Sequence, residues 1–235
     1  MTSSGCVQQQ LALNIRLRDD ATLDNFCGSV ALQPILTTLR AQRDPSGEPI
    51  VYLYGPADTG KSHLLQAACH MVEKSALYLP LADLHDFSPE EVVRDVELLD
   101  LVCLDDVHSV LQDESWELAL FHLFNRARQH GCKLLVSGNA APRALSVDLP
   151  DLQSRLSWGI VYQLTVPDDE VRKAILCFRA DQRGLSLSVE LATYIVSRAP
   201  RALGQLLALL EQLDKASLAQ QRVLTIPFVK SVLGW

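Results

Sequence analysis

The sequence predicts an α/β fold, a parallel five-stranded sheet with helices on both faces, followed by a small all-helical domain. Three observations support this prediction. Short apolar stretches rich in β-branched residues alternate with helical stretches through residue 166, which is the order of elements typical of a parallel sheet. From residue 167 onward only helical periodicity remains. A glycine-rich loop joins the first strand to the helix after it.

The first elements follow a helical stretch. Residues 23–42 carry apolar residues at helical spacing and end at the turn-forming cluster DPSGEP. Residues 50–55, IVYLYG, are β-branched and aromatic and end at glycine, which indicates a buried strand. Residues 61–74, KSHLLQAACHMVEK, follow as a helix. The glycine loop therefore lies between a strand and a helix.

The remaining strands of the sheet are expected at residues 76–82, 100–107, 132–139 and 158–166. Two helices lie between them. Residues 88–96 begin with Ser88 as the N-cap and Pro89 at the first helical position. Residues 114–131 form an amphipathic helix closed by Gly131.

The helical end of the chain contains four predicted helices, at residues 167–184, 188–199, 200–221 and 225–235. The change of pattern places a domain boundary near residues 165–167. We expect a tail over residues 1–18, an α/β nucleotide-binding domain over residues 19–166 and a helical domain over residues 167–235.

The composition excludes several classes of protein. A net charge of −7 argues against a protein that holds DNA through its overall field, so we expect no strong direct DNA binding. The chain has no signal-peptide pattern and no apolar run of membrane-spanning length, so a cytoplasmic protein without membrane contact is expected. The six cysteines have neither C-x-x-C nor zinc-site spacing and are interpreted as reduced thiols.

Residues 55–62, GPADTGKS, have the spacing of a phosphate-binding loop. The glycines let backbone N–H groups turn toward phosphates, and the next helix points its positive N-terminal end at them. Lys61 is expected to reach the β- and γ-phosphates, and the Ser62 hydroxyl to meet Mg²⁺. The alternative is a glycine turn before an unrelated Lys-Ser helix. The expected nucleotide contacts are Gly55, Asp58, Thr59, Gly60, Lys61, Ser62 and His63.

Two aspartates, Asp105 and Asp106, end the third predicted strand. We expect this strand beside the loop-bearing strand, with Asp105 holding the nucleotide's metal. Asp106 stands where many ATPases carry a glutamate that orients the attacking water. Aspartate is shorter, and a displacement of about 1 Å can lower a rate roughly a hundredfold, so the sequence predicts nucleotide binding with weak hydrolysis. The alternative for Asp106 is a helix cap or a solvated loop acid.

Two further polar residues are candidates for the reaction. Asn139 follows the fourth strand and is expected to sense the γ-phosphate, although a turn asparagine explains it equally well. Arg155 lies on a short helix before the last strand, on the face opposite its inward-facing residues. Those inward-facing residues are expected to be Leu152, Leu156 and Trp158. The alternative for Arg155 is a surface ion pair with Asp148 or Asp151.

The ordered set GPADTGKSHLL, LVCLDDV and DLQSRLSWG, together with the helical end, resembles the AAA+ part of the bacterial replication initiator DnaA. The resemblance covers almost the whole chain. The ending LEQLDKASLAQQRVLTIPFVKSVL is similar to that of the short Hda members of this DnaA/Hda family. DnaA continues into a helix-turn-helix DNA-binding domain, which we expect to be missing here.

The resemblance implies an AAA+ P-loop domain with a helical lid that binds ADP or ATP with Mg²⁺. Hda proteins bind ADP, attach to the DNA-loaded sliding clamp (the β clamp of DNA polymerase III) and promote hydrolysis of the ATP held by DnaA, which prevents repeated initiation. By this resemblance Arg155 is an arginine finger presented in trans to DnaA's ATP, and such fingers contribute about 10³–10⁵ in rate. The AAA+ resemblance also allows a homo-oligomer.

The N-terminal tail carries the pattern of a sliding-clamp ligand, glutamine followed by leucine and further apolar residues. The matching residues are Gln10, Leu11, Leu13 and Ile15. Ala12 and Asn14 replace residues often found in such peptides. A first β-strand or an unstructured tail is the alternative.

The resemblance implies two more nucleotide contacts. Phe26 lies where the family packs the adenine, and a buried core aromatic is an equally good account. A lid arginine is expected near the start of the third lid helix, where Arg198 and Arg201 are the candidates. Arg201 fits best because Pro200 can occupy the first helical turn. Alignment of the lid with the family instead places Gly204 at that position.

Two other functions compete with this interpretation. A self-contained AAA+ ATPase or a helicase loader of the DnaC kind needs robust hydrolysis of its own, which the Asp-Asp strand end and the acidic composition disfavour. A binding module with a relic phosphate loop is disfavoured by intact Lys61, Ser62 and Asp105.

Overall fold

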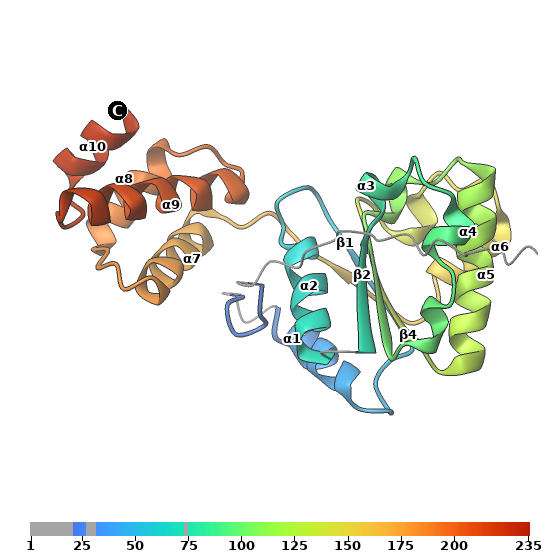
Figure 1. Cartoon of the computed structure of the whole chain (residues 1–235). Helices are drawn as coiled ribbons and strands as arrows, with labels where there is room; N and C mark the ends of the chain where they lie inside the picture. The colour runs from blue at the N-terminus through green and yellow to red at the C-terminus, as the bar shows by residue number, and fades with distance from the viewer. Residues whose placement is uncertain (1–20, 27–31, 73–74) are drawn as a thin grey trace, which may run out of the picture.

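The computed structural model describes residues 21–26, 32–72 and 75–235. Its chain forms two lobes, an α/β domain and a helical lid, joined by an extended segment after the last strand (Figure 1). The prediction of an α/β domain followed by helices is confirmed.

The sheet contains five strands, all paired in parallel in the order β2-β3-β4-β1-β5. The strands are β1 (Ile50–Tyr54), β2 (Ala76–Pro80), β3 (Leu101–Asp105), β4 (Lys133–Gly138) and β5 (Ile160–Gln163). The five predicted strands are thus confirmed, but the expectation that β3 lies beside β1 is wrong. β4 pairs with both and separates them, so the aspartate-bearing strand and the loop-bearing strand are one strand apart.

Helices cover both faces of the sheet (Figure 1). One face carries α1 (Gln33–Arg40) and α2 (Lys61–Val72), and the other carries α3 (Leu81–Leu84), α4 (Pro89–Val92), α5 (Glu114–His130) and α6 (Pro150–Leu156). Short 3₁₀ turns lie at η2 (Ala41–Arg43), η4 (Val96–Leu98), η5 (Val107–Ser109) and η6 (Pro142–Ala144). The helix expected over residues 23–42 is shorter, because α1 begins at Gln33.

Two apolar cores follow from the alternation of side chains along the strands. Tyr52 and Val102 face the core under α5, which Trp116 and Phe124 fill, whereas their strand neighbours face the core under α2. Because both faces are buried, the strands read as continuous apolar runs rather than as alternating ones.

The ends of α4 and α5 follow the sequence signals to different degrees. The Asp113 carboxylate accepts the backbone N–H groups of Ser115 and Trp116, and Gly131 closes α5 with φ 77°. Ser88 is the N-cap of α4 as predicted, but its hydroxyl donates to the Glu90 carboxylate instead of capping the backbone.

The lid contains α7 (Asp169–Gln182), α8 (Val189–Arg198), α9 (Leu203–Gln220) and α10 (Ile226–Leu233) around its own core of Leu176, Ile195, Leu206 and Val229. The expectation that Pro200 opens the third lid helix is wrong, because α9 begins at Leu203 with Ala202 as its N-cap. Pro200 and Arg201 instead lie in the turn before it. Among the described residues, no helix is long and apolar enough to span a bilayer.

Candidate functional site

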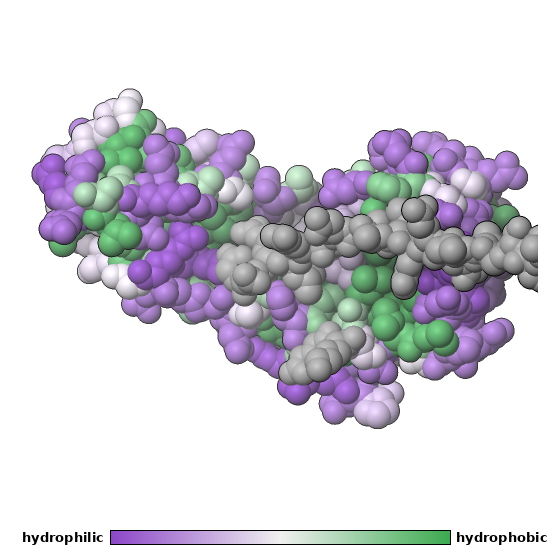
Figure 2. Space-filling model, in the orientation of Figure 1, coloured by the Kyte–Doolittle hydropathy of each residue, from purple (hydrophilic) through white to green (hydrophobic). Residues whose placement is uncertain are grey.

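A cleft of ≈ 770 Å³ lies between the carboxyl ends of the strands and the lid. Figure 2 shows a dip in the upper outline of the molecule between the two lobes, with hydrophilic residues over much of the visible lid. The cleft is lined by the glycine loop from Ala57 to His63, by Phe26, by Asp106 and Asn139 beyond the strands, and by residues of α7 and α9. The fold therefore brings together most of the predicted nucleotide contacts.

Two glycines allow the loop to take its shape. Gly60 has φ 93°, and a Cβ there would lie 2.8 Å from the Phe26 ring. Gly55 has φ 157°, and a Cβ there would lie 2.2 Å from the carbonyl oxygen of Leu164. Any other residue at these positions would collide with the Phe26 ring or the Leu164 carbonyl, and both Phe26 and Leu164 line the cleft.

Lys61 begins α2 and is buried, and its ammonium donates to the carbonyl oxygens of Gly55 (2.9 Å) and Pro56 (2.8 Å). The Thr59 hydroxyl also donates to Pro56, at 3.0 Å. The loop is thus folded around its own cation at the positive N-terminal end of α2, which is an arrangement suited to an anionic ligand. Ser62 follows in the first turn and lines the cleft.

Asp105 is buried at the end of β3, and both of its carboxylate oxygens are hydrogen-bonded. One accepts the Tyr78 hydroxyl at 2.6 Å, and the other accepts the hydroxyl of Ser137. The Ser137 oxygen in turn accepts the backbone N–H of Asp106 at 2.8 Å. Sequence reasoning missed Tyr78 and Ser137, whose signal is a polar atom inside the apolar strands β2 and β4.

Asp106 is half-exposed on the cleft and adopts φ 53°. Its pKa is raised, first by burial and then by the adjacent negative charge of Asp105, and His108 and Lys61 oppose that shift. Its side chain makes no helix-capping hydrogen bond, and one carboxylate oxygen lies 4.0 Å from Nδ1 of His108. Asn139 follows β4 and is exposed on the same cleft.

An aromatic wall closes one side of the cleft. The rings of Phe26 and His63 lie 5.6 Å apart, and Nε2 of His63 is 3.0 Å from the carbonyl oxygen of Thr22. This contact ties the segment that carries Phe26 to α2. The wall provides an apolar surface next to the phosphate loop, which suits a planar base.

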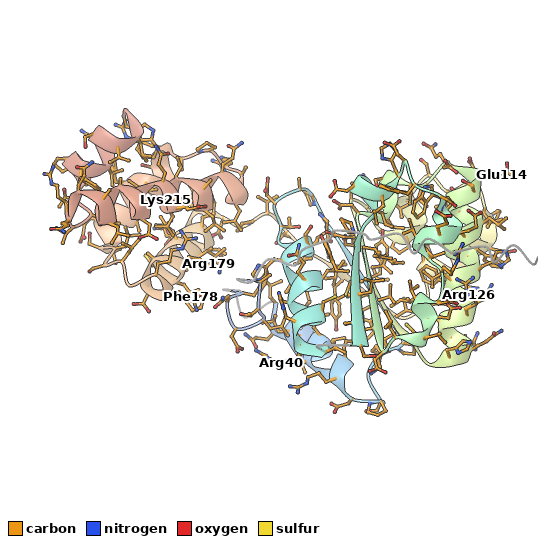
Figure 3. The ribbon with its side chains drawn as sticks, in the orientation of Figure 1. Arg40, Glu114, Arg126, Phe178, Arg179 and Lys215 are labelled. Atoms are coloured by element: carbon orange, nitrogen blue, oxygen red, sulfur yellow. The ribbon has the colours of Figure 1, made fainter. Side chains whose placement is uncertain are left out.

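The lid supplies a different set of residues from the expected one. Neither Arg198 nor Arg201 lines the cleft; Arg201 is exposed in the turn before α9, and the Arg198 guanidinium lies 5.0 Å from the Tyr194 ring. Arg179 of α7 does line it, near the side of the lid that faces the α/β domain (Figure 3). The sequence could have indicated this role, because Val171, Ile175 and Arg179 recur every four residues and therefore lie on one face of α7.

Arg155 lies on α6 outside this cleft and is half-buried. Its Nε donates to the Asn125 side-chain oxygen at 3.1 Å, and its guanidinium carbon lies 4.0 Å from the centre of the Trp158 ring. Within the described part of the chain it forms no ion pair with Asp148 or Asp151, and its terminal amino groups have no hydrogen-bond partner.

Trp158 packs against the core that contains the fully buried Leu152 and Leu156, as expected, although its own side chain is only partly buried. A second guanidinium, that of Arg128, lies 4.7 Å from the same ring. The Trp158 indole therefore makes cation–π contacts with two guanidinium groups.

The expected clamp-binding residues, Gln10, Leu11, Leu13 and Ile15, lie outside the described residues. The four cysteines that are described, Cys69, Cys103, Cys132 and Cys177, are free thiols. Among the residues described, no cluster of histidine, cysteine or acidic side chains has the arrangement of a metal site formed by protein alone.

Two known families match different parts of the chain, one over the α/β domain and one over the helical lid. Residues 22–163 match the bacterial DnaA ATPase domain, and residues 169–233 match the Hda lid domain. An uncharacterized protein of Haemophilus influenzae is 44% identical over 232 residues, which cover 97% of this chain and 100% of that protein.

Solved structures share the fold at lower sequence identity. Domain III of the replication initiation protein DnaA of Thermotoga maritima has a TM-score of 0.78 and 22% identity, and the match covers 94% of this chain and 98% of that one. AMPPCP-bound DnaA from Aquifex aeolicus has a TM-score of 0.72 and 22% identity, with 88% and 70% covered. The RuvB branch-migration motor of Thermotoga maritima has a TM-score of 0.69 and 15% identity, with 91% and 71% covered.

Proposed function

The chain belongs to the DnaA/Hda family of AAA+ proteins, and we propose that it is a nucleotide-bound negative regulator of replication initiation. In this proposal it attaches to the DNA-loaded sliding clamp and stimulates hydrolysis of the ATP held by DnaA. It acts in the cytoplasm, without strong DNA binding of its own, and as an activator of another ATPase rather than as a motor.

Its own cleft would hold ADP or ATP. DnaA relatives bind nucleotide, as the AMPPCP-bound structure from Aquifex aeolicus illustrates. The loop from Gly55 to Ser62 would bind the phosphates through backbone N–H groups and Lys61, while Phe26 and His63 would flank the base.

Ser62, in the first turn of α2, and Asp105, at the end of β3, carry hard oxygen ligands and would hold a Mg²⁺ ion. When bound, the ion neutralises phosphate charge. Tyr78 and Ser137 hold the Asp105 carboxylate in place. Asp106 is too short to replace the usual glutamate, which supports weak intrinsic hydrolysis.

The observation that carries the proposal is the setting of Arg155. Its guanidinium is oriented by Asn125 and Trp158, and its terminal amino groups are unpaired among the described residues. None of the described residues that line the chain's own cleft comes from α5 or α6. Arg155 is therefore suited to a phosphate held by another molecule, where a guanidinium stabilises charge that develops during phosphoryl transfer.

The remaining parts of the proposal rest on the sequence. Residues 1–18 would form a clamp-binding tail ahead of the nucleotide-binding domain (19–166) and the lid (167–235), with Gln10 and Leu11 entering the clamp pocket. Self-association through the AAA+ domain is a further expectation.

The test is hydrolysis of DnaA-bound ATP with the purified protein, with and without clamp-loaded DNA. Stimulation should need the clamp and should fall about a thousandfold in Arg155→Ala. Arg128→Ala is the matched control, because it removes the other guanidinium from Trp158 and should retain most of the stimulation. Unchanged stimulation by Arg155→Ala would refute the finger assignment. Rapid ATP hydrolysis without DnaA would favour a self-contained ATPase or helicase loader instead.

A further inference from the structure

A buried acid, Glu117, lies at the start of the helix pair that carries Arg155. α5 and α6 lie side by side on the part of the α/β domain away from the lid (Figure 1). Glu117 is in the first turn of α5, and only 2% of its surface is exposed. Within the described part of the chain its carboxylate forms no ion pair. Its charge must be balanced by hydrogen bonds, because an unpaired buried carboxylate is strongly destabilising.

Three backbone N–H groups donate to the Glu117 carboxylate. Oε1 accepts from Gln112 at 2.9 Å and from Asp148 at 3.1 Å, and Oε2 accepts from Leu149 at 2.7 Å. Gln112 lies in the turn that leads into α5, whereas Asp148 and Leu149 lead into α6. Hydrogen bonds to an ionised acceptor are stronger than those between neutral groups. One side chain therefore holds the entry of α6 against the entry of α5.

The first turn of α6 depends on this contact. Leu149 is the N-cap of α6 and offers no side-chain cap. Its carbonyl oxygen accepts the backbone N–H groups of Leu152 (3.0 Å) and Gln153 (3.3 Å). Its own N–H donates to Glu117, so the residue that begins the helix is fixed through both its N–H and its carbonyl. A displacement of residue 149 would therefore move α6 as a unit.

The same side of α5 contacts Arg155 near the other end of α6. Glu117, Phe121 and Asn125 recur every four residues and therefore lie on one side of α5. The Arg155 guanidinium carbon lies 5.7 Å from the centre of the Phe121 ring, and its Nε donates to Asn125 at 3.1 Å. Because α6 is only 7 residues long, a shift at its beginning reaches Arg155.

We propose that Glu117 is a positioning residue for the finger: its carboxylate sets the direction of α6, so that Arg155 points at the phosphate held by DnaA. Asp148 and Pro150 are exposed, and water could supply acceptors to such a surface segment, whereas a buried carboxylate also fixes its position. A finger needs this precision, because a misplacement of about 1 Å can cost roughly a hundredfold in rate. This inference rests on the proposed function, since it gives Glu117 a part in the stimulation of DnaA.

Glu117→Gln in the full chain tests the proposal. The amide keeps the length of the side chain but replaces one acceptor oxygen by an N–H donor, so at least one backbone N–H loses its acceptor. The matched control is Glu114→Gln, which removes the same charge from an exposed residue in the first turn of α5 (Figure 3). Glu117→Met, of similar volume, replaces Glu117→Gln if that variant does not melt cooperatively.

Two measurements separate positioning from folding. In hydrogen exchange, which needs no DnaA, residues 145–156 should exchange faster in Glu117→Gln, whereas the strands and the lid should be unchanged. In hydrolysis of DnaA-bound ATP on clamp-loaded DNA, the maximal stimulation should fall roughly tenfold. The protein concentration that gives half-maximal stimulation should stay the same, because affinity for DnaA is not affected. Glu114→Gln should change none of these quantities.

The double variant Glu117→Gln with Arg155→Ala shows whether the carboxylate acts through the arginine. If it does, the double variant should stimulate no less than Arg155→Ala alone. A further loss in the double variant, unchanged exchange or undiminished stimulation in Glu117→Gln, or an equal loss in Glu114→Gln would overturn the inference and leave the proposed function intact. Absence of stimulation by the unsubstituted protein would instead refute the proposed function, and the inference with it.

Discussion

The Ser137 hydroxyl donates to the Asp105 carboxylate across the β3–β4 pair. The same hydroxyl oxygen accepts the backbone N–H of Asp106. One serine near the end of β4 therefore holds both aspartates of the neighbouring strand. Without it, one oxygen of a buried carboxylate would lose its donor.

Ser137→Ala should lower the free energy of unfolding by about 1–3 kcal/mol, because it leaves a buried charged oxygen and a backbone N–H without a partner. Chemical denaturation measures this change. Ser154→Ala on the exposed face of α6 is the control and should change the stability by less than about 0.5 kcal/mol. Equal effects in the two variants would show that the hydrogen bonds of Ser137 contribute little.

Asn125→Ala should reduce the stimulation of DnaA-bound ATP hydrolysis roughly tenfold, because Arg155 loses the acceptor that orients its Nε. The DnaA hydrolysis assay on clamp-loaded DNA measures the stimulation, and a melting curve should be nearly unchanged. Asn125→Asp keeps an oxygen acceptor at the same position and should therefore retain more stimulation than Asn125→Ala. If alanine and asparagine are equivalent, Trp158 alone orients the guanidinium.

Asp106→Asn should stabilise the fold at neutral pH but not near pH 4. The pKa of Asp106 is raised in the folded protein, so the folded state holds a proton more tightly than the unfolded state does. Stability due to this group therefore falls as the pH rises above the unfolded pKa of about 3.9 and through the higher folded pKa. Thermal melting of both proteins as a function of pH measures the difference. A difference that grows toward low pH would contradict the sign of the shift.

Gly60→Ala should abolish measurable ADP binding and destabilise the fold, because the residue has positive φ and its Cβ would collide with Phe26. Gly184→Ala separates the two causes. Gly184 also has positive φ, at 71°, but an added Cβ meets nothing within 4 Å. The Gly184→Ala variant should lose only about 1–2 kcal/mol of stability from backbone strain and should keep its ADP affinity. Calorimetry and denaturation together test both expectations.

Replacing Leu11 and Leu13 with alanine should abolish capture by the sliding clamp, since each buried leucine contributes about 1.5–3 kcal/mol. A pull-down with the purified clamp measures this loss, and a melting curve should show that the fold is kept. Capture at the original level would leave the tail without a clamp-binding role.

The strands and the phosphate loop could be predicted from the sequence because their signals are local. Apolar β-branched runs bounded by turns predicted all five strands, and the glycine-lysine spacing predicted the cleft loop. The sheet order could not be predicted in the same way. The insertion of β4 between β1 and β3 depends on pairing between strands far apart in the chain.

The contacts that the sequence did not predict share one cause: each depends on a neighbour from another helix or strand. Tyr78 and Ser137 look like ordinary strand residues until β2 and β4 place them on either side of Asp105. Trp158 packs against the core as its sequence indicates, but its contact with Arg128 depends on α5. The start of α9 was misplaced because Pro200 is equally compatible with a turn and with a first helical position.

The close approach of Leu164 to Gly55 has a mechanical consequence. Leu164 is the first residue after β5 on the way to the lid, and its backbone N–H donates to Tyr54 at 2.7 Å while its carbonyl rests on the loop glycine. The pivot for any swing of the four-helix lobe therefore begins at residue 165, directly against the glycine that starts the loop. A small displacement of Gly55 would therefore produce a larger displacement at the far end of the four-helix lobe.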